Sequence, residues 1–142
     1  MRRGVIVDTG PLVAYLSQRD KYHAWTCGQL EHVGFPLLTC EAVLTETCFL
    51  IGRNGGDAGD PIEMLNRGWL SIPFDLSLES EAITRLMRKY ANVPISLADS
   101  CLLRMTELLP ESHLLTLDSD FSIYRKHGRE SVPVVMPDTI ER

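Results

Sequence analysis

The sequence lacks any long apolar run. Its first apolar stretch, residues 4–7, is interrupted by Asp8, so it is too short for the apolar region of a signal peptide or for a membrane-spanning helix. We therefore expect a cytoplasmic protein without a membrane segment. Cys-x-x-Cys spacing is also missing, and a chain of 142 residues needs no disulfide staples. Reduced, buried thiols are accordingly predicted for Cys27, Cys40, Cys48 and Cys101.

Several motifs that carry chemistry are absent as well. The chain has no Gly-x-Ser-x-Gly, no glycine-rich phosphate loop and no Gly-x-Gly-x-x-Gly, which argues against a serine hydrolase, a P-loop nucleotidase and a dinucleotide-binding enzyme. Its four histidines are scattered without a His-x-x-x-His pair, so no zinc site is indicated. The net charge of −5 argues against a broad nucleic-acid-binding face. This net charge is still compatible with a local cluster of basic residues, or with a metal ion that bridges the protein to a phosphate group.

What the sequence does contain is an alternation of short apolar strands with helical patterns. Strands are predicted at residues 4–7, 36–39, 69–74, 113–117 and 132–136, and helices at residues 11–16, 21–33, 41–52, 77–93 and 97–109, with Ser77 as a cap. Residues 53–61 give the densest turn signal. With 44% hydrophobic residues, the pattern predicts one α/β domain over residues 1–142, built on a mostly parallel sheet that helices cover on both faces.

The first strand leads into Asp8-Thr9-Gly10, a triplet that is the signature of aspartic proteases. Residues 50–54, "LIGRN", also resemble a downstream stretch of the retroviral-type enzymes. Those proteases are almost entirely β, whereas this chain runs directly from Gly10 into a helical pattern and has strong helical periodicity over residues 77–109. We therefore interpret the protease triplet as a coincidence.

Two of the predicted strands end in aspartate. Asp8 follows the first strand and Asp118 follows the strand at residues 113–117, with Asp120 two residues later. Because ligands of parallel sheets bind outside the carboxyl ends of the strands, these side chains are expected at one edge of the sheet. The alternative is that each aspartate only caps the turn or helix that follows it.

Two further acids interrupt apolar stripes on predicted helices. Glu46 shares a helical face with Val43, Phe49 and Leu50, and Asp99 shares one with Ile95, Leu102 and Leu103. A buried carboxylate needs a partner because desolvation is costly. That partner could be an arginine such as Arg53 or Arg104, or a cation bound by several acids together; an outward tilt of the side chain is the remaining alternative.

Taken as a set, the acids indicate a metal site. Four carboxylates in one pocket would repel one another unless a cation neutralised them, and hard oxygen ligands without histidine or cysteine favour Mg²⁺ or Mn²⁺. Such a site best serves phosphodiester hydrolysis by a metal-activated water. No side-chain nucleophile is then required.

Four stretches in this order resemble the PIN-domain ribonucleases, in particular the VapC-like toxins of toxin–antitoxin pairs: "VIVDTGPLVAYL", "VLTETCFLI", "ISLADSCLLRM" and "LLTLDSDF". The resemblance implies a three-layer α/β/α sandwich and Mg²⁺- or Mn²⁺-dependent endonucleolytic cleavage of RNA. It also implies a small antitoxin as partner and a homodimer. The implied catalytic and metal-binding residues are Asp8, Glu46, Asp99 and Asp118, with Asp120 as an auxiliary acid and Thr9 and Thr116 as supporting hydroxyls.

Two points stay open at this stage. The motif does not separate a ligand role for Glu46 from a role as general base. A catalytically silent relative that binds nucleic acid or serves as a scaffold would also keep these acids, and metal-dependent cleavage of RNA distinguishes it from an active enzyme.

Overall fold

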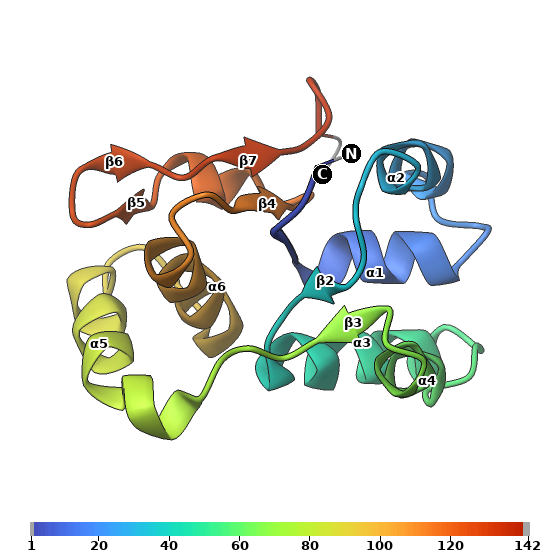
Figure 1. The fold of residues 1–142 in the computed structure, drawn as a ribbon, viewed down its shortest axis with the longest axis horizontal. Helices are drawn as coiled ribbons and strands as arrows, with labels where there is room; N and C mark the ends of the chain where they lie inside the picture. Colours follow the sequence, from blue (N-terminus) through green and yellow to red (C-terminus); the bar gives the residue numbers. More distant parts are fainter. Residues whose placement is uncertain (1, 141–142) are drawn as a thin grey trace.

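A central sheet of five parallel strands organises the molecule (Figure 1). The computed structural model describes residues 2–140. In the order β3-β2-β1-β4-β7, every neighbouring pair is parallel. The strands are β1 (Val5–Val7), β2 (Leu37–Leu38), β3 (Leu70–Ser71), β4 (His113–Leu115) and β7 (Val134–Val135). Each of them falls inside a predicted apolar run, and the predicted α/β class is confirmed.

Helices cover both faces of this sheet. Figure 1 shows α1, α2 and α4 to the right of the strands and α5 and α6 to the left, while α3 packs along α1. The central strands β1 and β4 are therefore almost wholly buried, which explains why their residues are apolar without alternation. The helices are α1 (Thr9–Leu16), α2 (His23–Leu30), α3 (Glu41–Arg53), α4 (Asp60–Asn66), α5 (Leu76–Lys89) and α6 (Leu97–Leu108).

The structure contains a helix and a hairpin that the pattern did not predict. Helix α4 begins at the end of the glycine-rich turn segment, and it buries only Pro61 and Met64, too few residues for a visible periodicity. Strands β5 (Arg125–Lys126) and β6 (Glu130–Ser131) form an antiparallel hairpin whose turn places His127 and Gly128 at positive φ. Because β6 is exposed, it lacks the apolar run by which the other strands were recognised.

The start of α5 corrects the expected cap. Asp75, and not Ser77, caps this helix: the Asp75 carboxylate accepts the N–H of Leu78 at 3.2 Å. The backbone of Asp75 is extended, as an N-cap requires, whereas Ser77 already lies inside the first turn. Helix α2 is also shorter than predicted, since it spans residues 23–30 in place of 21–33.

The cysteines and the membrane prediction can be compared with the structure directly. All four cysteines are free, but only Cys40 and Cys101 are buried, while Cys27 and Cys48 are partly exposed. The expectation of four buried thiols was therefore wrong for two of them. Between residues 2 and 140, no helix has both the length and the apolar character needed to cross a bilayer.

The carboxyl ends of β1 and β4 meet at the centre of the sheet. Their register pairs Val7 with Leu115, so Asp8 and Thr116 are the next residues on the two strands. The chain leaves β1 toward β2 on one side, and β4 lies on the other side. Such a reversal of strand order opens a crevice at the carboxyl edge of a parallel sheet, where ligands bind.

Candidate functional site

Asp8 is the most buried acid at this edge. Its side chain is 6% exposed, and both carboxylate oxygens accept hydrogen bonds: Oδ1 from the N–H of Thr9 at 2.7 Å and Oδ2 from the hydroxyl of Thr116 at 2.8 Å. Asp8 is thus also the N-cap of α1. The capping alternative is therefore confirmed for Asp8, and it is compatible with the predicted role in a site.

Burial raises the pKa of Asp8 to about 6 from 3.8. The hydrogen bonds from Thr116 and Thr9 lower the pKa, and the negative charges of Asp118 and Glu46 raise it. Desolvation is the largest cause, and the two hydrogen bonds do not cancel it. The carboxylate is therefore held in place by neutral donors, and no basic side chain among residues 2–140 pairs with it.

Asp118 and Thr116 form the other half of the strand-end pair. The Thr116 hydroxyl donates to Asp8 and accepts the N–H of Asp118 at 2.9 Å, so one fully buried side chain links the two acids. The Asp118 carboxylate in turn accepts the N–H of Asp120 at 2.9 Å and caps the short 3₁₀ helix η1 (Ser119–Ser122). The predicted supporting hydroxyl of Thr116 lies within the site and contacts both acids.

Glu46 reaches the site from α3. Its Oε2 atom accepts the hydroxyl of Thr9 at 3.0 Å, which connects Glu46 to the backbone amide bound by Asp8. The second predicted supporting hydroxyl thus also contacts an acid. Thr9 itself is 7% exposed, so this contact is partly shielded from water.

The reasoning that selected Glu46 was nevertheless wrong in one respect. Of its expected apolar stripe only Val43 is fully buried, because Phe49 is 64% exposed and Glu46 is exposed too. The buried face consists of Val43, Leu44, Thr47 and Ile51. Glu46 lies beside this face, where α3 packs along α1, and the outward tilt allowed by the sequence is what the structure has.

Asp99 lies in the first turn of α6. The hydroxyl oxygen of the N-cap residue Ser96 accepts the N–H of Asp99 at 3.0 Å. Partial burial raises the pKa of Asp99 to about 7, with further upward contributions from the charges of Asp8, Asp118 and Glu46. Because all three charges act on Asp99, the four predicted acids share one neighbourhood.

No basic side chain neutralises this group within residues 2–140. Arg104, one of the expected partners, pairs instead with Glu79 at 2.6 Å and with Glu107 at 3.2 Å. Across these described residues, Lys, Arg and His form no ion pair with Asp8, Glu46, Asp99 or Asp118. The alternative of a structural salt bridge to a nearby arginine is therefore not what the structure shows for these acids.

The acids are near one another without forming a ready-made chelate. Over residues 2–140, no three His, Cys, Asp or Glu side chains converge closely enough to hold an ion between them. A cation at this edge would therefore be bound by one or two carboxylates directly and would complete its coordination with water, as Mg²⁺ commonly does.

The sequence reasoning missed two residues that shape the site. Ser96 stands three residues before Asp99, and this Ser-x-x-Asp spacing is the signal of a capping pair that could have been read from the sequence. Tyr124 is fully buried, and burial together with the charges of Asp99, Asp120 and Asp118 raises its pKa. No sequence pattern marked Tyr124, because it follows a short 3₁₀ helix outside the apolar runs.

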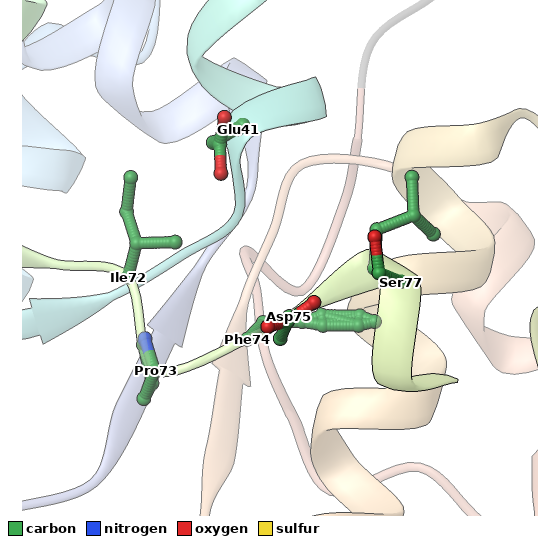
Figure 2. Close-up of a pocket in the computed structure, with 7 residues that line it drawn as sticks. Glu41, Ile72, Pro73, Phe74, Asp75 and Ser77 are labelled. Carbon is green, nitrogen blue, oxygen red and sulfur yellow. The ribbon is translucent and has the colours of Figure 1, made fainter. Parts of the chain in front are cut away.

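A hollow lies elsewhere on the molecule. Figure 2 shows it between the start of α3 and the segment that joins β3 to α5. Its volume is about 610 Å³, and its lining residues are Glu41, Ile72, Pro73, Phe74, Asp75, Leu76 and Ser77. None of the four site acids lines this hollow, so its size does not identify it as the reactive centre.

Comparison with solved structures identifies a similar protein. The crystal structure of VapC20 from Mycobacterium tuberculosis, described as a sarcin–ricin loop cleaving toxin, superposes with a TM-score of 0.71 and 21% sequence identity, over 91% of this chain and 99% of that chain. Comparisons with models of protein families and with curated proteins give no match. At this identity the likeness establishes the fold. The resemblance carried by the four motifs is thus confirmed at the level of architecture: the chain has the α/β/α fold of a PIN-domain toxin.

Proposed function

We propose that this protein is a metal-dependent endoribonuclease, acting as the toxin of a toxin–antitoxin pair. The observation that carries the proposal is the group of four acids at the carboxyl edge of β1 and β4, which no basic side chain of residues 2–140 neutralises. The fold shared with VapC20, a toxin described as cleaving the sarcin–ricin loop, supports RNA as the substrate class.

The donor set fits Mg²⁺ or Mn²⁺. All candidate ligands are carboxylate oxygens, which hard divalent cations prefer, and the raised pKa values of Asp8 and Asp99 show that negative charge there is unfavourable without a cation. We assign Asp8, Asp99 and Asp118 as ligands, directly or through water, with Asp120 as an auxiliary acid. A bound cation would supply Lewis-acid chemistry, lowering the pKa of water and offsetting charge on the phosphate.

Hydrogen bonds from surrounding residues orient the carboxylates of the site in the absence of a ligand. Thr116 and the backbone amide of Thr9 hold both oxygens of Asp8, which restricts the carboxylate to one orientation. The Thr9 hydroxyl directs Glu46 toward the same place, while the rest of Glu46 stays open to solvent. Glu46 is therefore assigned either as a ligand or as the base that accepts a proton from attacking water.

Cleavage of a panel of structured RNAs tests this proposal. The purified protein is expected to cut in Mg²⁺ or Mn²⁺ and not in EDTA, and Asp8→Asn is expected to abolish cutting. Asp75→Asn is the matched control, because Asp75 is also an N-cap aspartate but lies at α5, away from the site. Cutting that survives equally in wild type and Asp8→Asn would indicate a contaminant. Silence of the wild-type protein on every RNA and metal would instead favour the catalytically silent binding protein.

The proposed partners follow from the same assignment. They are an RNA substrate, a short antitoxin protein and a second copy of the chain, and the proposed location is the cytoplasm. Expression of the wild-type protein is expected to arrest growth, and co-expression of a short neighbouring gene is expected to relieve it. Light scattering of the purified protein tests the homodimer, and a monomeric mass at micromolar concentration would refute it.

A further inference from the structure

Three of the four site acids are connected by side-chain hydrogen bonds. Thr116 joins Asp8 to the backbone of Asp118, and Thr9 joins Asp8 to Glu46. Asp99 stands apart from this network. Within residues 2–140, no hydrogen bond links its side chain to the other three acids, so its position depends on whatever fixes the first turn of α6.

Tyr124 contacts the segment that leads into this turn. Its hydroxyl donates to the carbonyl oxygen of Pro94 at 3.1 Å, two residues before the N-cap Ser96. Pro94 belongs to the loop between α5 and α6, which has no regular secondary structure of its own. The hydrogen bond therefore ties the entry of α6 to the segment that follows Asp118 and Asp120.

The ring of Tyr124 is itself held firmly. It is fully buried and packs edge-to-face against Tyr90 at 5.1 Å and Phe121 at 5.3 Å between ring centroids. Phe121 comes from η1 and Tyr90 from the end of α5, and Figure 1 shows α5, α6 and the β5–β6 hairpin gathered on one side of the sheet. A rigid ring in this position can transmit the placement of η1 to the start of α6.

We propose that Tyr124 is a positioning residue of the site: its hydroxyl holds the entry of α6, and thereby Asp99, in place against Asp118. The proposal deepens the proposed function and rests on it. Tyr124 touches no reacting atom, so its contribution is to the geometry of the acids. Hydrogen bonds made directly to a metal ligand commonly change metal affinity by about 10-fold to 100-fold, and for this contact, which acts through the backbone of Pro94, we expect the lower end of that range.

The chain offers a closely matched control. Tyr90 lies in the same aromatic cluster, and its hydroxyl also makes one hydrogen bond, accepting the N–H of Arg125 at 3.0 Å. Tyr90→Phe and Tyr124→Phe therefore remove the same atom from neighbouring rings. Only Tyr124→Phe releases the loop before Asp99.

Two measurements on the full chain test the proposal. Calorimetric titration with Mn²⁺, without RNA, is expected to show affinity about tenfold weaker in Tyr124→Phe and unchanged in Tyr90→Phe. In metal-free protein, amide hydrogen exchange at Asp99 and Ser100 is expected to quicken in Tyr124→Phe alone. In cleavage assays of Tyr124→Phe, the Mn²⁺ concentration that gives half-maximal cleavage should rise, while the KM for RNA should stay constant.

The outcomes separate the positioning role of Tyr124 from the proposed function. Equal Mn²⁺ affinity in wild type and Tyr124→Phe, unchanged exchange at Asp99, or the same loss in both variants would overturn the positioning role even if RNA is cleaved. If wild type binds Mn²⁺ but cuts no RNA, the proposed function fails, and the comparison of the two variants still decides the role of Tyr124. Absence of Mn²⁺ binding by wild type would overturn both the positioning role and the metal assignment.

Discussion

Replacing Asp8 by asparagine is expected to stabilise the metal-free protein at alkaline pH while it abolishes cleavage. Asp8 is 6% exposed, and burial is the main reason that its pKa is raised to about 6. At pH 8 the carboxylate is ionised in both the folded and the unfolded chain, so the folded state carries the whole desolvation cost. An uncharged side chain of the same shape removes that cost.

The magnitude follows from the two pKa values. A difference between 3.8 and about 6 corresponds to about 3 kcal/mol at about 1.4 kcal/mol per pKa unit. Because the folded-state pKa is the higher one, the folded protein binds this proton more tightly. The resulting stabilisation is fully present below pH 3.8 and is lost as the pH rises through about 6.

Asparagine keeps most of the local contacts of Asp8. Its carbonyl oxygen can accept the N–H of Thr9 and preserve the helix cap, since asparagine is as good an N-cap as aspartate. The hydrogen bond from Thr116 must be rearranged, which costs about 1 kcal/mol. We therefore expect a net gain of about 2 kcal/mol at pH 8 and a gain near zero at about pH 4.5.

The assay is urea unfolding in EDTA at pH 4.5 and pH 8, with Asp75→Asn as the control. The exposed Asp75 has the same capping role at α5, so its substitution should leave stability unchanged at both pH values. Addition of Mg²⁺ at pH 8 should stabilise wild type alone, and should therefore narrow or reverse the difference in free energy of unfolding between Asp8→Asn and wild type. An Asp8→Asn variant less stable than wild type at pH 8 in EDTA would refute the reasoning, because it would mean that a favourable contact outweighs the desolvation of Asp8.

Three further outcomes are expected. Since the pKa of Asp99 is raised to about 7, calorimetry should show Mn²⁺ affinity falling about tenfold from pH 8 to pH 6, and a flat profile would contradict this. Thr116→Val should weaken Mn²⁺ binding about tenfold, whereas the control Thr39→Val, a buried threonine at the end of β2, should not. Asp75→Ala should lower the free energy of unfolding by about 1 kcal/mol and Ser77→Ala should leave it unchanged; equal effects would contradict the cap assignment.

The sheet and the candidate site at its edge could be predicted because both depend on local features of the sequence. Strands buried on both faces must be apolar throughout, and residues that follow such strands must emerge at one edge when the strands are parallel. Asp8 and Asp118 satisfy both conditions, and the register of β1 and β4 brings their flanking residues together. The fold class and this pair of acids were therefore available from pattern and geometry alone.

The helical acids depended on packing that the pattern does not contain. Spacing assigned Glu46 to an apolar face with Val43 and Phe49, yet the buried face of α3 keeps Val43 and otherwise turns toward Leu44 and Thr47, so that Phe49 is left exposed. When a helix has apolar residues on more than one side, its sequence does not determine which side is buried. The buried side of α3 depends on its packing against α1. The hydroxyl of Thr9 on α1 donates a hydrogen bond to Glu46 and so orients its side chain.

The contacts around the acids predict that the proposed metal binding is linked to folding. Thr9, Thr116 and backbone amides orient the carboxylates through neutral donors, which fix geometry without removing charge. A salt bridge to an arginine would have removed the repulsion permanently and would have left less affinity for a cation. Neutral donors keep the acids close while the electrostatic cost persists in the folded chain. Any cation that relieves this cost binds the folded state preferentially, so stability at neutral pH should rise with metal concentration in proportion to RT ln(1 + [M]/Kd).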